Sequence, residues 1–174
     1  MLKPEWVKGF TQVQLDDAQA RYDLIFPPDL VADLRERRLV GGYDWSTESG
    51  AIRKMLIWPF DMLSAQLEYG YWWPSWGDRP SSAEARADIL RKALADAPKL
   101  IPLLSHRFLP ATPSESGNPV LSMYGFDTIY YGTNLDDYWK REFGELQTPI
   151  GTVRHIPFWS DIIERWEDVT RYDE

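Results

Sequence analysis

Short apolar runs separated by turn-forming residues dominate the stretch from Pro98 to Gly132. Apolar and aromatic runs of this length, bounded by Pro, Gly and Asn, are too short for helices and too apolar for loops. The pattern therefore predicts consecutive strands at the centre of a sheet. The same stretch contains polar residues that can take part in catalysis or binding, namely His106, Arg107, Asn118 and Asp127. It is therefore the first place to look for a site.

Helix signals precede this stretch. Thr11–Gln14 has the spacing of a capping box, and Leu15, Ala18 and Tyr22 follow on one helical face. Pro28 is suited to the first turn of a second helix, because its missing N–H has no intrahelical partner there. The charged run 35–38 near the end of that helix is interpreted as a solvated face.

The middle of the chain gives weaker signals. Residues 43–50 read as a loop, and Pro59 predicts the start of a short third helix. The aromatic run 69–73 predicts the first strand of the sheet. A second capping box at 81–84 opens an amphipathic helix whose polar face, which includes Arg86, is expected to point to solvent.

The last third of the chain contains further helix and strand signals. Asn134 is an N-cap for an amphipathic helix, 153–156 resembles a strand, and Ser160 is expected to cap a final helix with Ile162 and Trp166 inward. This order predicts an α+β fold in which helices pack on a central mixed, largely antiparallel sheet. The length of 174 residues fits a single domain, 1–174.

Composition narrows the function classes. The chain is 44% hydrophobic and 14% aromatic, which places it outside the disordered class. Its formal net charge of -8 repels a phosphate backbone and attracts a basic protein. We therefore predict no nucleic acid as a partner. For the acidic charge itself, solubility is favoured over any specific acidic function. The absence of cysteine excludes disulfides and cysteine metal sites, and the lack of a long apolar run predicts a cytoplasmic protein with no membrane segment.

Catalytic motifs are poorly represented. Neither phosphate-binding glycine pattern occurs, and the two histidines, His106 and His155, lack metal-ligand spacing, so we predict no cofactor and no metal. Ser105 or Ser122 with His106 and Asp127 would supply a Ser-His-Asp set, but neither serine lies in a strand-to-helix elbow. We expect Asp127 to pair with an arginine, Arg107, and Asn118 and Asp127 to be structural polar residues.

Paired carboxylates beside aromatic rings would indicate glycoside chemistry. The acids nearest the aromatic segment 72–79 are Glu68, Asp78 and Asp127. Tryptophans among Pro and Gly are more often packing anchors than sugar platforms. This interpretation therefore remains an alternative.

An ordered set of motifs resembles the SUKH superfamily, in particular its bacterial branch similar to fungal cell-wall-synthesis regulators. The motifs are FPPDL at 26–30, WWPSWGDRP at 72–80, APKLIP at 97–102, HRFLP at 106–110, GNPVLSMY at 117–124, DTIYYG at 127–132 and IPFWSD at 156–161. Together they cover nearly the whole chain, from about 11 to 163. The resemblance implies an α+β domain without catalytic residues, and many bacterial members look like immunity proteins that neutralise toxins by binding them.

The leading hypothesis is a non-enzymatic protein-binding domain, an immunity protein whose partner is a basic toxin domain. The residues expected to line or support the partner-binding groove are Trp72, Trp73, Trp76, Asp78, Arg79, His106 and Arg107. One alternative is a small-molecule or carbohydrate binder or hydrolase at 72–79, and another is a regulatory binding module in cell-wall control. In a third, all of these residues belong to the core and surface residues elsewhere carry the function.

Overall fold

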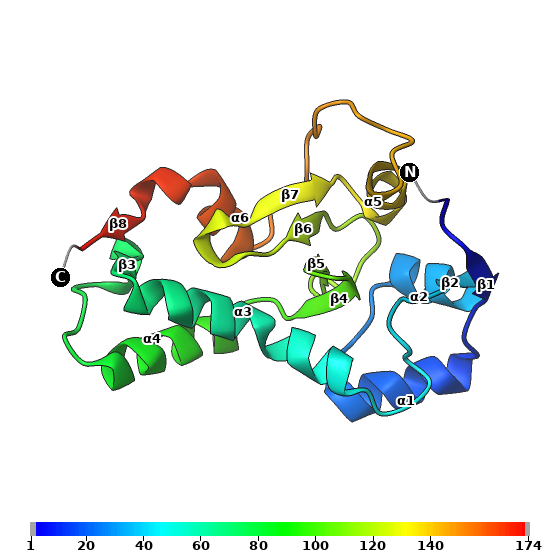
Figure 1. The fold of residues 1–174 in the computed structure, drawn as a ribbon, viewed down its shortest axis with the longest axis horizontal. Coiled ribbons are helices and arrows are strands. Elements are labelled where there is room, and N and C mark those ends of the chain that lie inside the picture. The colour runs from blue at the N-terminus through cyan, green and yellow to red at the C-terminus, as the bar shows by residue number, and fades with distance from the viewer. Residues whose placement is uncertain (1–2, 173–174) are drawn as a thin grey trace.

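A four-stranded sheet lies at the centre of the computed structural model, which describes residues 3–172 (Figure 1). Its strands follow the chain in order: β4 (Leu100–Leu104), β5 (Arg107–Pro110), β6 (Val120–Ser122) and β7 (Ile129–Gly132). Each neighbouring pair of strands is antiparallel. The predicted sheet was mixed and largely antiparallel, and these four strands contain no parallel pair. The predicted α+β class is confirmed.

Alternation along these strands divides the core between two faces. On β4, Leu100 and Ile101 belong to different hydrophobic clusters, and on β5 the same holds for Phe108 and Leu109. Successive side chains of a strand point to opposite faces. Because both faces are covered, the strands read as continuous apolar runs. Pro102 is tolerated because β4 is an edge strand with a register shift at this position.

One face of the sheet packs against the N-terminal part of the chain. This part contains β1 (Trp6–Lys8), α1 (Gln12–Tyr22), α2 (Pro28–Glu36) and β2 (Arg37–Leu39), and α5 (Leu135–Glu142) joins it. The capping box of α1 is present: the Thr11 hydroxyl accepts from the Gln14 amide at 3.2 Å, and the Gln14 side chain accepts from the Thr11 amide at 2.8 Å. Pro28 is the first residue of α2, as predicted.

The other face packs against α3 (Gly50–Glu68), α4 (Ala83–Asp96) and the C-terminal segments. The smaller elements here are β3 (Tyr71–Trp72), η1 (Pro74–Trp76), η2 (Gly125–Asp127), α6 (Trp159–Glu164), η3 (Trp166–Asp168) and β8 (Thr170–Arg171). Helices α3 and α4 contact each other, and α4 lies below α3 on the left of the view in Figure 1.

Five predictions in this part of the chain are wrong. Pro59 does not begin a helix but lies buried inside α3, which begins after Ser49. The run 69–73 contributes β3, which pairs with β8 in a separate two-stranded sheet. Residues 153–156 form no strand. The final helix begins at Trp159 with Phe158 as its cap, and Trp166 is 62% exposed.

The charged run 35–38 was expected to be the solvated face of a helix, yet the helix ends at Glu36 and β2 begins at Arg37. β2 pairs with β1, so this part of the chain bonds to a segment distant in sequence. The Arg37 guanidinium lies 4.2 Å from the centre of the Trp6 ring and 3.2 Å from Asp33. Arg37 thus packs on an aromatic ring and is not only solvated.

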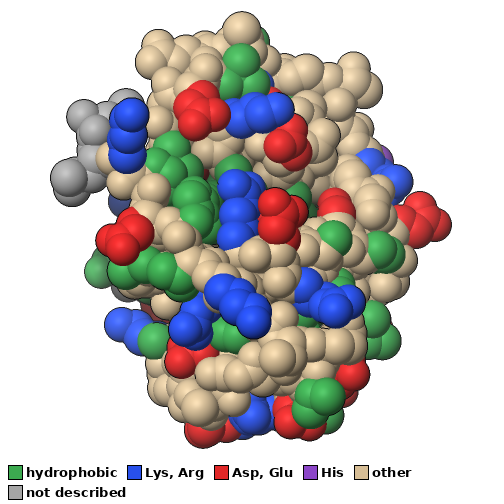
Figure 2. All heavy atoms as spheres, turned by 90° about the vertical axis from the view of Figure 1, so that its right-hand side faces the viewer, with side chains coloured by type: hydrophobic (Ala, Val, Ile, Leu, Met, Phe, Trp, Pro, Cys, Tyr) green, Lys and Arg blue, Asp and Glu red, His purple; other side chains and the backbone are tan. Residues whose placement is uncertain are grey.

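The face formed around β1, β2 and α2 carries charges of both signs. Several Lys and Arg side chains lie in the middle of this face, with acidic side chains beside and around them (Figure 2). Arg38 lies 4.0 Å from Asp44 and 5.3 Å from the centre of the Phe10 ring.

Within residues 3–172, no helix is both long and apolar enough to cross a bilayer.

Candidate functional site

The tryptophans of the segment 72–79 serve the core. Trp72 is 0% exposed and Trp73 is 5% exposed. The Trp72 indole N–H donates to the Gly77 carbonyl oxygen at 2.7 Å, which satisfies the polar atom of a fully buried ring. Both indoles are buried, so of the two predicted roles, lining or supporting a groove, Trp72 and Trp73 do not have the first.

The faces of the rings in this segment are covered by other rings. Trp73 stacks on Phe126 with ring centres 6.3 Å apart and an interplanar angle of 13°, and the half-buried Trp76 stacks on Phe158 at 6.4 Å and 12°. A sugar platform requires an open ring face. These stacked contacts instead pin the irregular turn to η2 and to the residue before α6.

The charged residues beside the segment are also engaged. Asp78 is exposed, whereas the half-buried Arg79 donates to the Leu67 carbonyl oxygen at 3.0 Å. Glu68 accepts two hydrogen bonds from the Nη2 atom of Arg86, at 3.1 Å and 2.9 Å to its two carboxylate oxygens. Arg86 was expected to face solvent but is 5% exposed. It is drawn inward because it also donates to two carbonyl oxygens of the turn before α4.

Arg107 does not pair with Asp127, so that prediction is wrong. Arg107 Nε lies 3.3 Å from a carboxylate oxygen of Glu142 on α5, and its Nη1 donates to the Ser122 hydroxyl at 2.8 Å. The exposed Asp127 accepts from the Gln66 side chain on α3 at 3.5 Å. The two residues separate because β5 directs Arg107 towards α5, whereas η2 lies against α3.

Asn118 has the structural role that the sequence predicts. It is fully buried, and its amide nitrogen donates to the carbonyl oxygens of Pro110 and Pro113, both at 2.9 Å. Its side-chain oxygen accepts from Arg154 at 2.7 Å. One side chain therefore closes the connection between β5 and β6.

The hydrogen bonds of His106 define its protonation state. Its Nε2 lies 2.6 Å from Arg107 Nη1, and a guanidinium can only donate, so Nε2 accepts. The ring proton is then on Nδ1, which lies 3.2 Å from the Ser105 hydroxyl oxygen and donates to it. Burial and the positive charge of Arg107 lower the pKa of His106, so its ring is neutral at neutral pH.

This arrangement does not assemble the Ser-His-Asp set considered from the sequence. A general base needs a free nitrogen facing the nucleophile, and the lone pair of His106 faces Arg107 instead. Asp127 bonds to Gln66 rather than to the imidazole. The chemistry of this turn is hydrogen bonding and packing.

His106 opens onto a surface hollow of about 240 Å³, which we call the aromatic cleft. The cleft lies between the loop before α3, the first half of α3, the β4–β5 turn and the residue that follows Met123. Its lining residues are Tyr43, Ala51, Lys54, Met55, Trp58, Ser105, His106 and Tyr124.

The rings of the cleft are held from behind. The Trp58 indole N–H donates to the Met123 carbonyl oxygen at 2.9 Å, and the Tyr43 hydroxyl donates to the Ser105 carbonyl oxygen at 3.0 Å. Tyr124 packs edge-on to both Trp58 and His106, with ring centres 5.9 Å and 6.1 Å away. Tyr124 remains 51% exposed, so the cleft presents an aromatic surface to solvent.

Sequence reasoning identified one member of the cleft, His106, and missed its three other rings. Tyr43 lies in the loop before α3, Trp58 lies on α3 and Tyr124 follows β6, so no local pattern connects them. An apolar strand continued by a tyrosine predicts burial, yet Tyr124 points to solvent. Only the tertiary packing of α3 on the sheet brings these residues together.

Two further observations bear on function. Within residues 3–172, no group of three or more His, Asp or Glu side chains is placed to hold a metal ion. Comparisons of the chain with protein-family models, with curated proteins and with solved structures found no match.

Proposed function

We propose that this chain is a non-enzymatic protein-binding domain, and more specifically an immunity protein that binds and neutralises a toxin. The observation that carries the proposal is the aromatic cleft, in which a hydrogen bond anchors the Trp58 indole and the neighbouring Tyr124 is half exposed. Tyrosine and tryptophan are the residue types most enriched among binding hot spots. The resemblance to the SUKH superfamily supports the immunity role.

Pre-organisation supports the choice of this surface. His106 and Ser105 are tied to each other, and Arg107 is fixed by Glu142 and Ser122 behind the turn. A partner that docks here orders few side chains, and each side chain that does not need ordering saves about 1 kcal/mol. A rigid rim of this kind suits tight binding with little adjustment.

The charge of the chain supports a basic partner. A net charge of -8 speeds the encounter with a positively charged protein and rejects acidic ones. The cleft itself contains Lys54 and the neutral His106 and no acid. The side chain that enters the cleft is therefore apolar or aromatic, and basic residues of the partner contact the surrounding surface.

The test needs a candidate toxin domain, which is to be sought among the genes that neighbour the gene of this chain. Co-expression is expected to restore growth, and the purified pair is expected to bind directly in calorimetry. Tyr124→Ala should weaken binding by about thirtyfold, the size of a hot-spot loss near 2 kcal/mol. Tyr69→Ala is the matched control, because Tyr69 is a 75% exposed tyrosine outside the cleft, and it should leave affinity unchanged.

The two parts of the proposal fail separately. Absence of both rescue and direct binding with the wild-type chain would overturn the immunity role. Binding that Tyr124→Ala and Tyr69→Ala weaken equally, or not at all, would overturn the assignment of the cleft and leave the binding function standing.

A further inference from the structure

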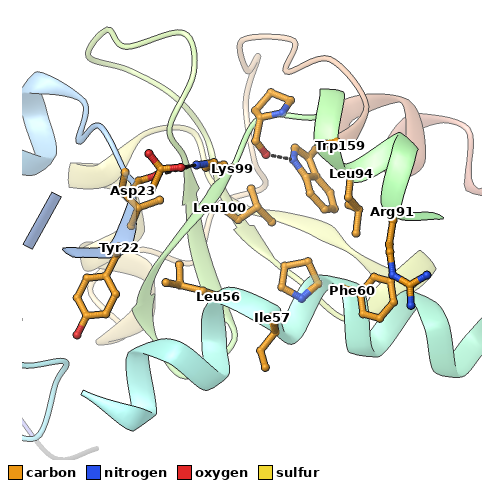
Figure 3. A pocket seen from close by; sticks show the side chains of 14 residues that line it. Tyr22, Asp23, Leu56, Ile57, Phe60, Arg91, Leu94, Lys99, Leu100 and Trp159 are labelled. Atoms are coloured by element: carbon orange, nitrogen blue, oxygen red, sulfur yellow. Dashed lines mark hydrogen bonds and ion pairs between the residues drawn. The ribbon is translucent and has the colours of Figure 1, made fainter. Parts of the chain in front are cut away.

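A second hollow, unrelated to the aromatic cleft, lies on the opposite side of α3. It has a volume of about 380 Å³ and is enclosed by the end of α1, the middle of α3, the second half of α4 and the start of β4 (Figure 3). We call it the apolar groove. Its volume lies at the lower end of the range for sites that hold small molecules.

The floor of the groove is aliphatic and aromatic. Leu56, Pro59 and Phe60 come from α3, and Leu94 and Leu100 face them from α4 and β4 (Figure 3). None of these side chains has a hydrogen-bonding group. The body of a ligand that fills this part must therefore be apolar, because a polar group placed here would lose its hydrogen bonds to water.

The indole N–H of Trp159, in the wall of the groove, is already satisfied. Trp159 is 2% exposed, and its indole N–H donates to the Pro98 carbonyl oxygen at 2.7 Å, as the dashed line in Figure 3 marks. The almost fully buried indole therefore presents little surface to the groove and no free donor. Specific polar recognition can come only from the ends.

A basic side chain lies at each end of the groove. Arg91 on α4 lies at one end, where its guanidinium is 5.4 Å from the centre of the Phe60 ring. Lys99 lies at the other end and donates to Asp23, with Nζ and the carboxylate oxygen 2.5 Å apart. Two cations and one acid thus line a groove in a chain whose net charge is negative.

Arg91 is the cation that is available to a ligand. Its Nη1 donates to Asp88 at 2.6 Å, but this pair is 60% and 65% exposed, so it contributes little and exchanges readily. A guanidinium presents a planar fork that matches a carboxylate, and further N–H groups of Arg91 are free to donate. The Lys99–Asp23 ion pair closes the far end without a net charge.

We infer that the apolar groove binds an amphipathic carboxylate of the fatty-acid type. The unbranched apolar chain lies on the floor formed by α3, Leu94 and Leu100, and the carboxylate accepts hydrogen bonds from Arg91. This site does not depend on the protein-binding function. Neither Arg91 nor Lys99 lines the aromatic cleft.

Calorimetry with decanoate, below its micelle concentration, tests the inference on the full chain. We expect one decanoate to bind per chain and decylamine, which has the same apolar length and the opposite charge, to bind at least about tenfold more weakly, as expected when a charge-assisted bond is lost. Arg91→Gln should weaken decanoate binding by a similar factor. Lys92→Gln, an exposed lysine next to it on α4, should leave binding unchanged.

A second variant guards against unfolding as an explanation. Leu94→Trp is designed to fill the groove and should abolish decanoate binding while the circular dichroism spectrum stays that of the wild type. No binding of decanoate by the wild-type chain would overturn the inference. Equal binding of decylamine, or equal losses from Arg91→Gln and Lys92→Gln, would also overturn it.

Discussion

Replacing Arg107 with methionine tests whether the network behind the aromatic cleft stabilises the fold. The side chains of Arg107 and Glu142 are only 15% and 19% exposed, so removing the guanidinium leaves a carboxylate in a poorly solvated place. Breaking a fully buried ion pair costs about 3–5 kcal/mol, and partial exposure reduces this to about 2 kcal/mol. The Ser122 hydroxyl loses a donor, which adds about 1 kcal/mol.

A smaller contribution comes from the ring beneath the guanidinium. Arg107 lies 3.9 Å from the centre of the Tyr131 ring, a contact worth about 0.5–1 kcal/mol. The free energy of unfolding of Arg107→Met should therefore fall by about 3.5–4 kcal/mol relative to the wild type. Urea unfolding followed by tryptophan fluorescence measures this difference.

A double-mutant cycle separates the ion pair from the other contacts. If the unpaired Glu142 carboxylate causes most of the destabilisation, the double variant Arg107→Met/Glu142→Met should be about 2 kcal/mol more stable than the sum of the two single losses implies. The exposed pair Arg165–Asp168 supplies the control, and Arg165→Met should change stability by no more than about 0.5 kcal/mol. Additive single losses, or a loss for Arg107→Met no larger than that for Arg165→Met, would refute the reasoning.

The remaining predictions concern a helix cap, a carboxylate and the core. Ser82→Ala should destabilise the chain by about 1 kcal/mol in urea unfolding, because this hydroxyl caps α4, whereas Ser81→Ala should change stability by less than about 0.5 kcal/mol. Burial opposes ionisation of Asp137, but hydrogen bonds from a neighbouring guanidinium and from a threonine outweigh it and lower its pKa to about 2. Because the folded pKa lies below the unfolded value, ionised Asp137 stabilises the native state above about pH 4, and this stabilisation is lost as the pH falls towards 2. Asp137→Asn should therefore lower the free energy of unfolding by about 2 kcal/mol at pH 7 and by much less at pH 2. Leu63→Ala should cost about 3 kcal/mol in thermal unfolding, since Leu63 is fully buried.

Helix starts could be predicted from the sequence where the capping interaction is local. Thr11 and Asn134 accept from backbone amides three residues later, as their spacing indicates. The predicted capping box at 81–84 lies one residue too early. Ser81 and Ser82 can both cap a helix, and the Ser82 hydroxyl is the one that accepts a hydrogen bond, from the Ala85 amide. Local rules identify that a helix begins but not which of two adjacent serines begins it.

Features that depend on tertiary contacts could not be predicted in this way. Pro59 reads as a helix start, yet α3 continues through it, because its buried residues Ile52, Leu63 and Leu67 stabilise the helix by packing. The partner of Arg107 was sought in the nearest acid of the strand region, whereas Glu142 reaches it from α5. Side chains that meet through packing carry no spacing signal in the sequence.

Helix α3 contributes to both the aromatic cleft and the apolar groove, and this determines which variants can distinguish the two sites. Lys54 and Trp58 are four residues apart and line the cleft, whereas Leu56 and Phe60, also four apart, line the groove. Residues with this spacing share a helix face, so the two sites use different faces of one helix. A substitution on α3 can disturb both. Tyr124 and residues of α4 lie off this helix, so a variant there that changes both decanoate and partner binding would indicate that α3 itself had moved.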